Sequence, residues 1–289
     1  MTEVRSFQPL SDRLAGLPID KTLHDDVPDW LEQPLRDWLQ TMFRDEGEPK
    51  AEYLARRALM RLRLTKVNKQ QRYAAFLALS EQAELLTVVD AILQLHPAWD
   101  EGSPIAQSMF RDKLETLDGI LADAGSRYRI DFNGRCLVGR VDSTIQAAVD
   151  SAIAAATPTA ADYMRTAWVA AYGLHPDPDK AYDQAILAVE DLTCPLVCPR
   201  NTKATLGVVI GDLRNQATQW ELIIEDTSTG QPADIGSVIQ MLDLLWKGQS
   251  RHAGSPNSRQ QTQTEAEAAV HMAAALAQWI SAGVLHRKP

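Results

Sequence analysis

Apolar residues recur every three to four positions along most of this chain, and that spacing constrains its fold more than any other feature. Between residues 30 and 42 the apolar side chains fall near i, i+4 and i+8, which places them on one face of a helix. The same pattern predicts helices over 51–64, 70–95 (one helix or two abutting ones), 105–124, 160–174, 177–192, 235–246 and 264–280. An all-α, mainly helical fold is therefore expected.

Several of these predicted helices carry end signals. Gly125 stands where a left-handed residue usually ends a helix. Thr157 and Asp177 are each followed by proline, the order typical of an N-cap and a first helical residue. Thr264 and Glu267 have the spacing of a capping box, which predicts the start of the last helix.

One segment has a β pattern instead. Residues 127–132 and 135–138 flank Asn133-Gly134, and this dipeptide favours a tight hairpin turn because both positions tolerate a positive φ. A two-stranded ribbon is marginally stable alone, so the hairpin is expected to pack against helices.

The stretch from Pro97 to Pro104 has the composition of a linker. It contains two prolines and one glycine and lacks periodicity. A chain of 289 residues is long enough for two cores. We therefore predict a smaller helical domain over residues 1–100 and a second domain over 105–289.

Composition excludes several classes of function. The net charge of −9 argues against non-specific coating of DNA, although it leaves room for a local basic surface. Three cysteines and an N-terminus without an apolar stretch predict a reducing, cytoplasmic location, and no apolar run reaches the ~20 residues of a membrane span. Cys194 and Cys198 could form half of a zinc site, but no second pair follows, so no metal is predicted. Phosphate-binding and dinucleotide-binding glycine motifs are absent from the sequence, so no cofactor is predicted either.

A polar segment between the last two predicted helices concentrates the side chains that RNA cleavage requires. Arg251 and His252 lie in it, with Lys247 before them and Asn257 after them. In cleavage by attack of a 2′-hydroxyl, a base takes the proton and a cation stabilises the phosphorane, so no metal is needed. The alternative interpretation is a solvated loop with a capping role.

Three segments carry a resemblance to a known family. They are Arg251-His252-Ala253-Gly254 before the helix that contains His271, Ala185 to Glu190, and Lys203 to Gly207. Together they resemble the HEPN-type domain of bacterial abortive-infection proteins over roughly residues 105–288, whereas residues 1–100 resemble no family. The resemblance implies a HEPN-like helical bundle with one β-hairpin. It also implies metal-independent RNA endonuclease activity in anti-phage defence, a homodimer that brings two motif loops into one cleft, and a possible partner protein of the defence system.

The sequence departs from the family at one position. Where the family has its closing His, this chain has Pro256, Asn257 or Ser258, and an asparagine cannot act as a base. A shifted reading assigns the imidazole to His252 and the cation to Lys247. The alternative is a catalytically silent module that binds RNA or protein.

Three further residues bear on this region. Glu190 is expected to position Arg251 or His252, and the alternative is an ordinary carboxylate at the edge of a helix face. His271, on the last helix, is interpreted as a packing or polar-face residue rather than a ligand. Apolar residues spread beyond one stripe on the last two helices, including Met241, Leu244 and Met272, predict burial on two sides by a homodimer.

The predicted N-terminal domain contains a basic run. Between Tyr53 and Ser80 there is no acidic residue, but there are seven cations: Arg56, Arg57, Arg61, Arg63, Lys66, Lys69 and Arg72. This run predicts a surface that binds RNA or another partner. The alternative is a solvated face that forms ion pairs with the acidic segment 20–48.

Overall fold

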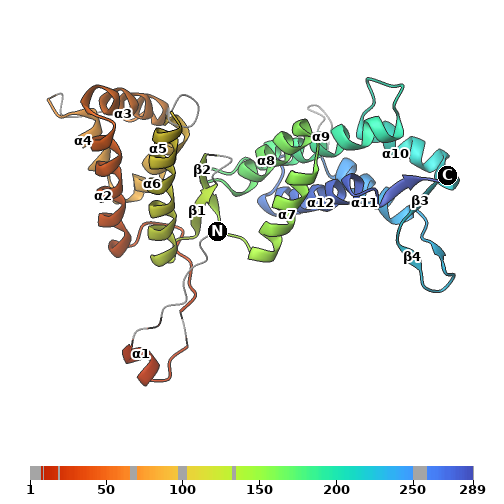
Figure 1. Cartoon of the computed structure of the whole chain (residues 1–289), viewed down its shortest axis with the longest axis horizontal. Helices are drawn as coiled ribbons and strands as arrows, with labels where there is room; N and C mark the ends of the chain where they lie inside the picture. The colour runs from red at the N-terminus through yellow and green to blue at the C-terminus, as the bar shows by residue number, and fades with distance from the viewer. Residues whose placement is uncertain are drawn as a thin grey trace. The chain divides into compact units, whose positions relative to one another are not determined.

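A computed structural model gives the structure of the protein and describes residues 8, 10–18, 20–65, 70–96, 103–131, 135–249 and 259–288. The fold is mainly α-helical, as predicted. Among the described residues, the strands form three two-stranded antiparallel sheets, and His24 and Ser126 form an isolated parallel bridge. The chain divides into two compact units, unit 1 with residues 1–140 and unit 2 with residues 141–289 (Figure 1).

Unit 1 is a set of helices with one hairpin. Its elements are α1 (Leu10–Leu14), α2 (Asp29–Asp45), α3 (Glu48–Leu62), α4 (Tyr73–Ala78), the 3-10 turn η1 (Gln82–Glu84), α5 (Leu85–Leu95), α6 (Pro104–Asp123), β1 (Tyr128–Asp131) and β2 (Cys136–Gly139). The helices predicted over 30–42, 51–64 and 105–124 are confirmed by α2, α3 and α6. Gly125, at a φ of 67°, follows α6 as expected. The stretch predicted over 70–95 as one helix or two abutting ones contains two helices, α4 and α5, with residues 79–81 and η1 between them.

Two buried carboxylates hold the hairpin against the helices. Asp118 of α6 accepts a hydrogen bond from the Ile130 amide of β1 at 3.1 Å, and Asp90 of α5 accepts one from the Leu137 amide of β2 at 2.7 Å. Ile130 and Leu137 face each other across the two strands. The predicted hairpin is therefore confirmed, and its predicted turn at 133–134 lies outside the described residues.

The boundary between the units differs from the predicted linker. α6 packs against α2, and the hairpin packs against α5 and α6, so these elements belong to unit 1. The chain passes from one unit to the other at residues 140 and 141, rather than between 97 and 104. Pro104 is the first residue of α6, a helix that packs in the core of unit 1.

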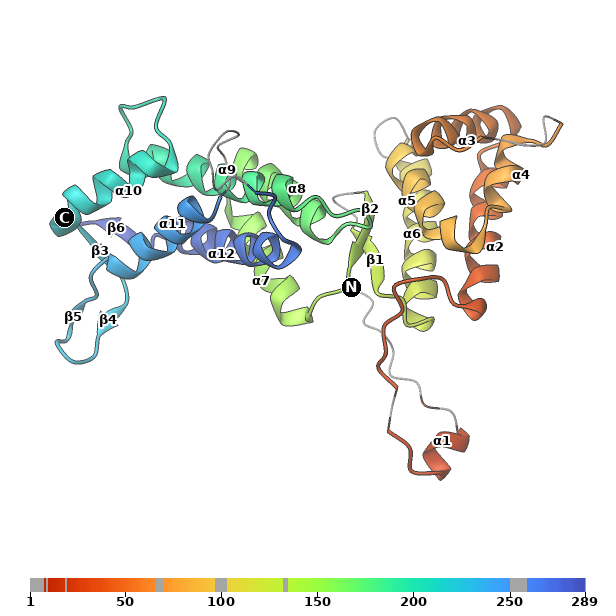
Figure 2. The same cartoon turned by 180° about the vertical axis from the view of Figure 1, so that it is seen from behind.

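Unit 2 is a helical bundle with two short strand pairs. Its helices are α7 (Ser143–Ala155), α8 (Pro158–Tyr172), α9 (Pro178–Val197), α10 (Leu206–Asn215), α11 (Gly236–Gly248) and α12 (Gln263–Ser281), with the 3-10 turn η3 (Ala217–Gln219). β3 (Trp220–Leu222) pairs with β6 (Leu285–Arg287) beside the C-terminus, and β4 (Glu225–Asp226) pairs with β5 (Gln231–Pro232) (Figure 2). α8 and α12 both pack against α9, which forms the centre of the core. No helix in the part of the chain that the structure describes has the length and apolarity to cross a membrane.

The helix starts in unit 2 confirm two predicted caps and correct a third. Thr157 accepts from the Ala160 amide and Asp177 from the Lys180 amide, as expected. The capping box of α12 forms between Thr262 and Glu265, two residues earlier than the predicted pair Thr264 and Glu267. Both pairs have the same spacing, so the sequence pattern alone does not distinguish them.

Candidate functional site

The predicted catalytic residues Arg251, His252 and Asn257 lie outside the described residues, but both ends of their segment are described. On one side, the Gln249 side-chain amide donates to Asp183. On the other, the Gln261 backbone N–H donates to Asp179 Oδ1 at 2.7 Å, and its side-chain Nε2 donates to the Gly248 carbonyl at 3.0 Å. The two ends of the segment are therefore tied to each other and to the first turns of α9.

The end of α11 is held on α9 by a close contact. The Tyr182 hydroxyl donates to the Leu245 carbonyl at 3.1 Å. A Cβ atom at Gly248 would lie 2.1 Å from that hydroxyl oxygen, so only glycine allows the approach. The last turn of α11, from which residues 250–258 continue, thus has a defined position within unit 2.

Glu190 is engaged elsewhere in unit 2. Its Oε1 accepts from the Leu206 backbone N–H at 2.8 Å and so satisfies a free amide at the start of α10. Asp183 precedes Glu190 by seven residues on α9, which is about 10 Å along the helix axis. The carboxylates that contact the ends of segment 250–258 are Asp179 and Asp183, which the sequence analysis did not single out.

Lys247, the alternative cation, forms an exposed ion pair. Its Nζ lies 2.6 Å from Asp243 Oδ2, and Arg214 contacts the other oxygen of that carboxylate at 3.1 Å. The hydrogen bond from Lys247 and the charge of Arg214 lower the pKa of Asp243. The Lys247 side chain is nevertheless 69% exposed, so the pair lies in water.

An aromatic cluster around His271 is the feature of unit 2 that sequence reasoning missed. The Tyr172 hydroxyl and His271 Nε2 form a hydrogen bond of 2.7 Å between α8 and α12, and the rings of Trp168 and His271 are nearly perpendicular. Burial lowers the pKa of His271 and raises the pKa of Tyr172 to about 12, so both groups are neutral near pH 7. The available sequence signal was the i, i+4 spacing of Trp168 and Tyr172 on one face of α8.

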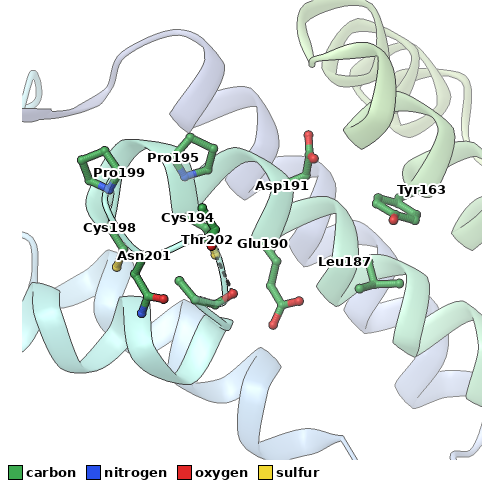
Figure 3. Close-up of a pocket in the computed structure, with 11 residues that line it drawn as sticks. Tyr163, Leu187, Glu190, Asp191, Cys194, Pro195, Cys198, Pro199, Asn201 and Thr202 are labelled. Carbon is green, nitrogen blue, oxygen red and sulfur yellow. Dashed lines mark hydrogen bonds between the residues drawn. The ribbon is translucent and has the colours of Figure 1, made fainter.

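An open groove of about 380 Å³ lies along the C-terminal half of α9 (Figure 3). It is lined by Tyr163, Leu187, Glu190, Asp191, Cys194, Pro195, Cys198, Pro199, Asn201, Thr202 and Ala204. The Cys194 thiol donates to the Ala204 carbonyl at 3.5 Å and the Cys198 thiol to Asp212 at 3.1 Å. Burial raises their pKa values to about 11 and 12, so both thiols are protonated at neutral pH. The described residues contain no group of three or more potential metal ligands.

Three arginines of the basic run lie on the solvent side of α3. Tyr53 and Met60 are 65% and 64% exposed, and Arg56, Arg57 and Arg61 lie on the same side of the helix. We call these five residues the α3 face. The Arg57 guanidinium lies 5.7 Å from the centroid of the Tyr53 ring. The α3 face therefore combines three cations with an exposed aromatic ring and an exposed thioether.

The cations of the basic run differ in their partners. Arg72 forms an ion pair of 2.8 Å with Glu48. Among the residues that the structure describes, Arg56, Arg57, Arg61 and Arg63 form no ion pair. Glu52, the acid on α3 nearest to them in sequence, accepts instead from the backbone amides of Tyr73 and Ala74. Lys66 and Lys69 lie outside the described residues.

No family model matches the chain, and no curated protein or solved structure was found to match it. The resemblance to HEPN-type domains therefore rests on the quoted sequence segments alone and remains a prediction.

Proposed function

We propose that this protein binds RNA through the α3 face. The observation that carries the proposal is a set of surface arginines in a chain of net charge −9: Arg56 and Arg61 are exposed, Arg57 is half-buried, and none has an acidic partner among the described residues. Arginines that stabilise a fold are usually paired, whereas phosphate binding needs guanidinium groups that are free to meet the ligand. An exposed tyrosine between the arginines adds the aromatic surface that nucleic-acid sites use.

The distribution of charge supports placing this function in unit 1. Unit 2 contains 10 Lys and Arg against 16 Asp and Glu, which gives a net charge of −6. Unit 1 contains 19 against 22, and seven of its cations fall in the acid-free stretch between Tyr53 and Ser80. A polyanion is therefore repelled by most of the chain and attracted to one surface.

The test is RNA affinity as a function of salt concentration, measured by fluorescence anisotropy. We expect Arg56→Glu, Arg57→Glu and Arg61→Glu together to lower affinity at least 100-fold. We also expect log Kd to depend less steeply on log[salt], by about 0.7 for each lost phosphate contact on a single strand. The matched control carries the same charge change at exposed cations elsewhere: Arg13→Glu, Arg200→Glu and Lys288→Glu. Equal losses in the two triple variants would refute the α3 face as the site.

A second candidate function is metal-independent RNA cleavage in anti-phage defence, by Arg251 and His252. The specific observation in its favour is that both ends of the segment are held by hydrogen bonds: Gln249 donates to Asp183, and Gln261 donates to Asp179. A reactive segment needs fixed ends to place its side chains. Cleavage should then persist in EDTA, produce a cyclic phosphate end and disappear in His252→Ala. Binding without cleavage in the wild type would leave the silent RNA-binding alternative.

The same proposal includes a homodimer. Met241 and Met272 are half-buried against the core of their own unit, whereas Leu244 on α11 is 63% exposed. Leu244 is thus the residue that a second copy would cover. Light scattering at micromolar concentration should give a dimer for the wild type and a monomer for Leu244→Glu, and a monomeric wild type would contradict the proposal.

A further inference from the structure

The α3 face has an apolar line along its middle and arginines on both sides of that line. At about 100° per residue, Tyr53 and Met60 lie on one line along the helix, opposite the buried side. Arg56 stands on one side of this line, and Arg57 and Arg61 stand on the other. The buried side is made by Ala51, Leu54, Ala55, Ala58 and Leu59. The surface is therefore an apolar ridge with one arginine on one side and two on the other.

We infer that this ridge recognises single-stranded RNA by stacking of its bases, an inference that rests on the proposed function above. In a single strand the bases turn to one side of the backbone and can stack on an aromatic ring, while the phosphates remain within reach of arginines beside it. Tyr53 supplies the ring, and Arg56 and Arg57 supply the flanking charges. Met60, two turns further along α3, continues the apolar line for a neighbouring base.

A duplex does not fit this arrangement. Its bases are already stacked inside the helix, and the major groove of A-form RNA is too deep and narrow for side chains to read. A duplex would contact the arginines through its phosphates and leave Tyr53 and Met60 in water. The ridge therefore contributes to affinity only when the bases are exposed.

The contact between Arg57 and Tyr53 strengthens the inference. With the guanidinium 5.7 Å from the ring centroid, a cation–π attraction favours this orientation of the ring. A ring that favours one orientation loses less freedom when a base stacks on it, and a guanidinium plane is itself a stacking surface for bases. Tyr53 is 65% exposed, so its contact with Arg57 does not serve to bury the ring in the core.

The experiment compares three labelled probes of one sequence: single-stranded RNA, the perfect RNA duplex and single-stranded DNA. The wild type should bind both single strands more tightly than the duplex. Tyr53→Ala should weaken single-strand binding roughly tenfold or more and leave duplex binding unchanged. Tyr53→Phe should restore the affinity, because it keeps the ring.

The dependence on salt separates stacking from charge. Tyr53→Ala should leave the slope of log Kd against log[salt] unchanged, whereas Arg57→Glu should reduce it. Thermal unfolding of Tyr53→Ala should match the wild type, since the side chain is exposed. The inference is overturned if Tyr53→Ala binds single strands as the wild type does, if the duplex binds as tightly, or if DNA does not bind. Absence of any RNA binding by the wild type would instead refute the proposed function.

Discussion

The arginines of the α3 face and the polar residues Glu190, Lys247 and His271 of unit 2 differ in what they contact. On the α3 face, Arg56 and Arg61 point into solvent without ion-pair partners among the described residues. In unit 2, Glu190 binds an amide of α10, Lys247 binds Asp243 and His271 binds Tyr172. Glu190, Lys247 and His271 of unit 2 therefore already have partners within the fold.

This difference gives each class of residue its own experimental signature. A side chain engaged inside the fold should affect stability when it is replaced and leave RNA affinity unchanged. A side chain of the α3 face should affect RNA affinity and leave stability within about 0.5 kcal/mol of the wild type. Four substitutions or conditions test this contrast, in order of decreasing effect.

The largest effect is expected from Trp168→Ala. Trp168 is 3% exposed and packs against the tilted ring of Tyr172 with 4.4 Å between ring centroids, so its removal leaves a cavity that costs about 3–5 kcal/mol. Denaturant unfolding measures the loss, and RNA affinity should stay at the wild-type value under native conditions. Trp168→Phe is the control. Its cost should be smaller, because it keeps a ring and removes an indole N–H that has no hydrogen-bond partner.

Acidification should destabilise unit 1 through His96. The imidazole is buried against Phe110, and burial lowers its pKa to about 4, although Glu46 raises it and Lys113 lowers it further. Because the pKa in the folded state is below the unfolded value near 6.5, the unfolded chain takes up the proton first. The stabilisation is therefore complete above pH 6.5 and is lost as the pH falls towards 4, by at most about 3 kcal/mol.

The variant His96→Gln tests whether His96 causes this pH dependence. His96→Gln should flatten the fall in melting temperature between pH 7 and pH 5. RNA affinity of the folded wild type should stay constant between pH 6 and pH 8, since arginines do not titrate there. An unchanged pH profile in the variant would assign the acid sensitivity to another group.

A smaller effect is expected from Tyr172→Phe. The substitution removes the hydroxyl that bonds His271 Nε2 and should cost about 0.5–1.5 kcal/mol, with RNA affinity unchanged. The measurement is again denaturant unfolding. If RNA cleavage is found and its pH profile shifts in Tyr172→Phe, His271 takes part in the reaction and the contrast between the two units fails.

The smallest effect is expected from Lys247→Ala. Its ion pair with Asp243 is solvent-exposed, and exposed pairs contribute about 0.2–1 kcal/mol, less at high salt. Unfolding in low and high salt should show a difference of this size that decreases with salt. A large loss of RNA cleavage with unchanged stability would instead identify Lys247 as the cation of a reactive site.

The sequence predicted helices well where one local signal decided the outcome. Thr157 and Asp177 each begin a helix, and Gly125 follows the end of another, because a cap depends on a few adjacent residues. The start of α12 was misplaced by two residues, since two threonines each precede a glutamate at the same spacing. The pair that forms is the one next to a tertiary contact. Gln261, which directly precedes Thr262, donates its backbone N–H to Asp179, 82 residues earlier in the chain.

Tertiary contacts account for what was missed. The strands β3 and β6 have three residues each and pair across more than 60 residues, which is too short a pattern to detect locally. The role of Glu190 depends on where α10 begins in space, and the pair of Tyr172 and His271 depends on the packing of α8 on α12. The basic run was visible in the sequence, but its division into a paired Arg72 and unpaired residues on α3 required the fold.

The two carboxylates that hold the hairpin have a consequence for how the chain tolerates change. Asp90 and Asp118 bind backbone amides of facing residues in the two strands, so they hold the register from the helix side. Lengthening a flexible connection adds only about 0.6 kcal/mol for each doubling of its length. A peptide tag inserted between residues 133 and 134 should therefore leave unit 1 folded. A fluorophore attached at this insertion, between residues 133 and 134, should leave the α3 face unaltered.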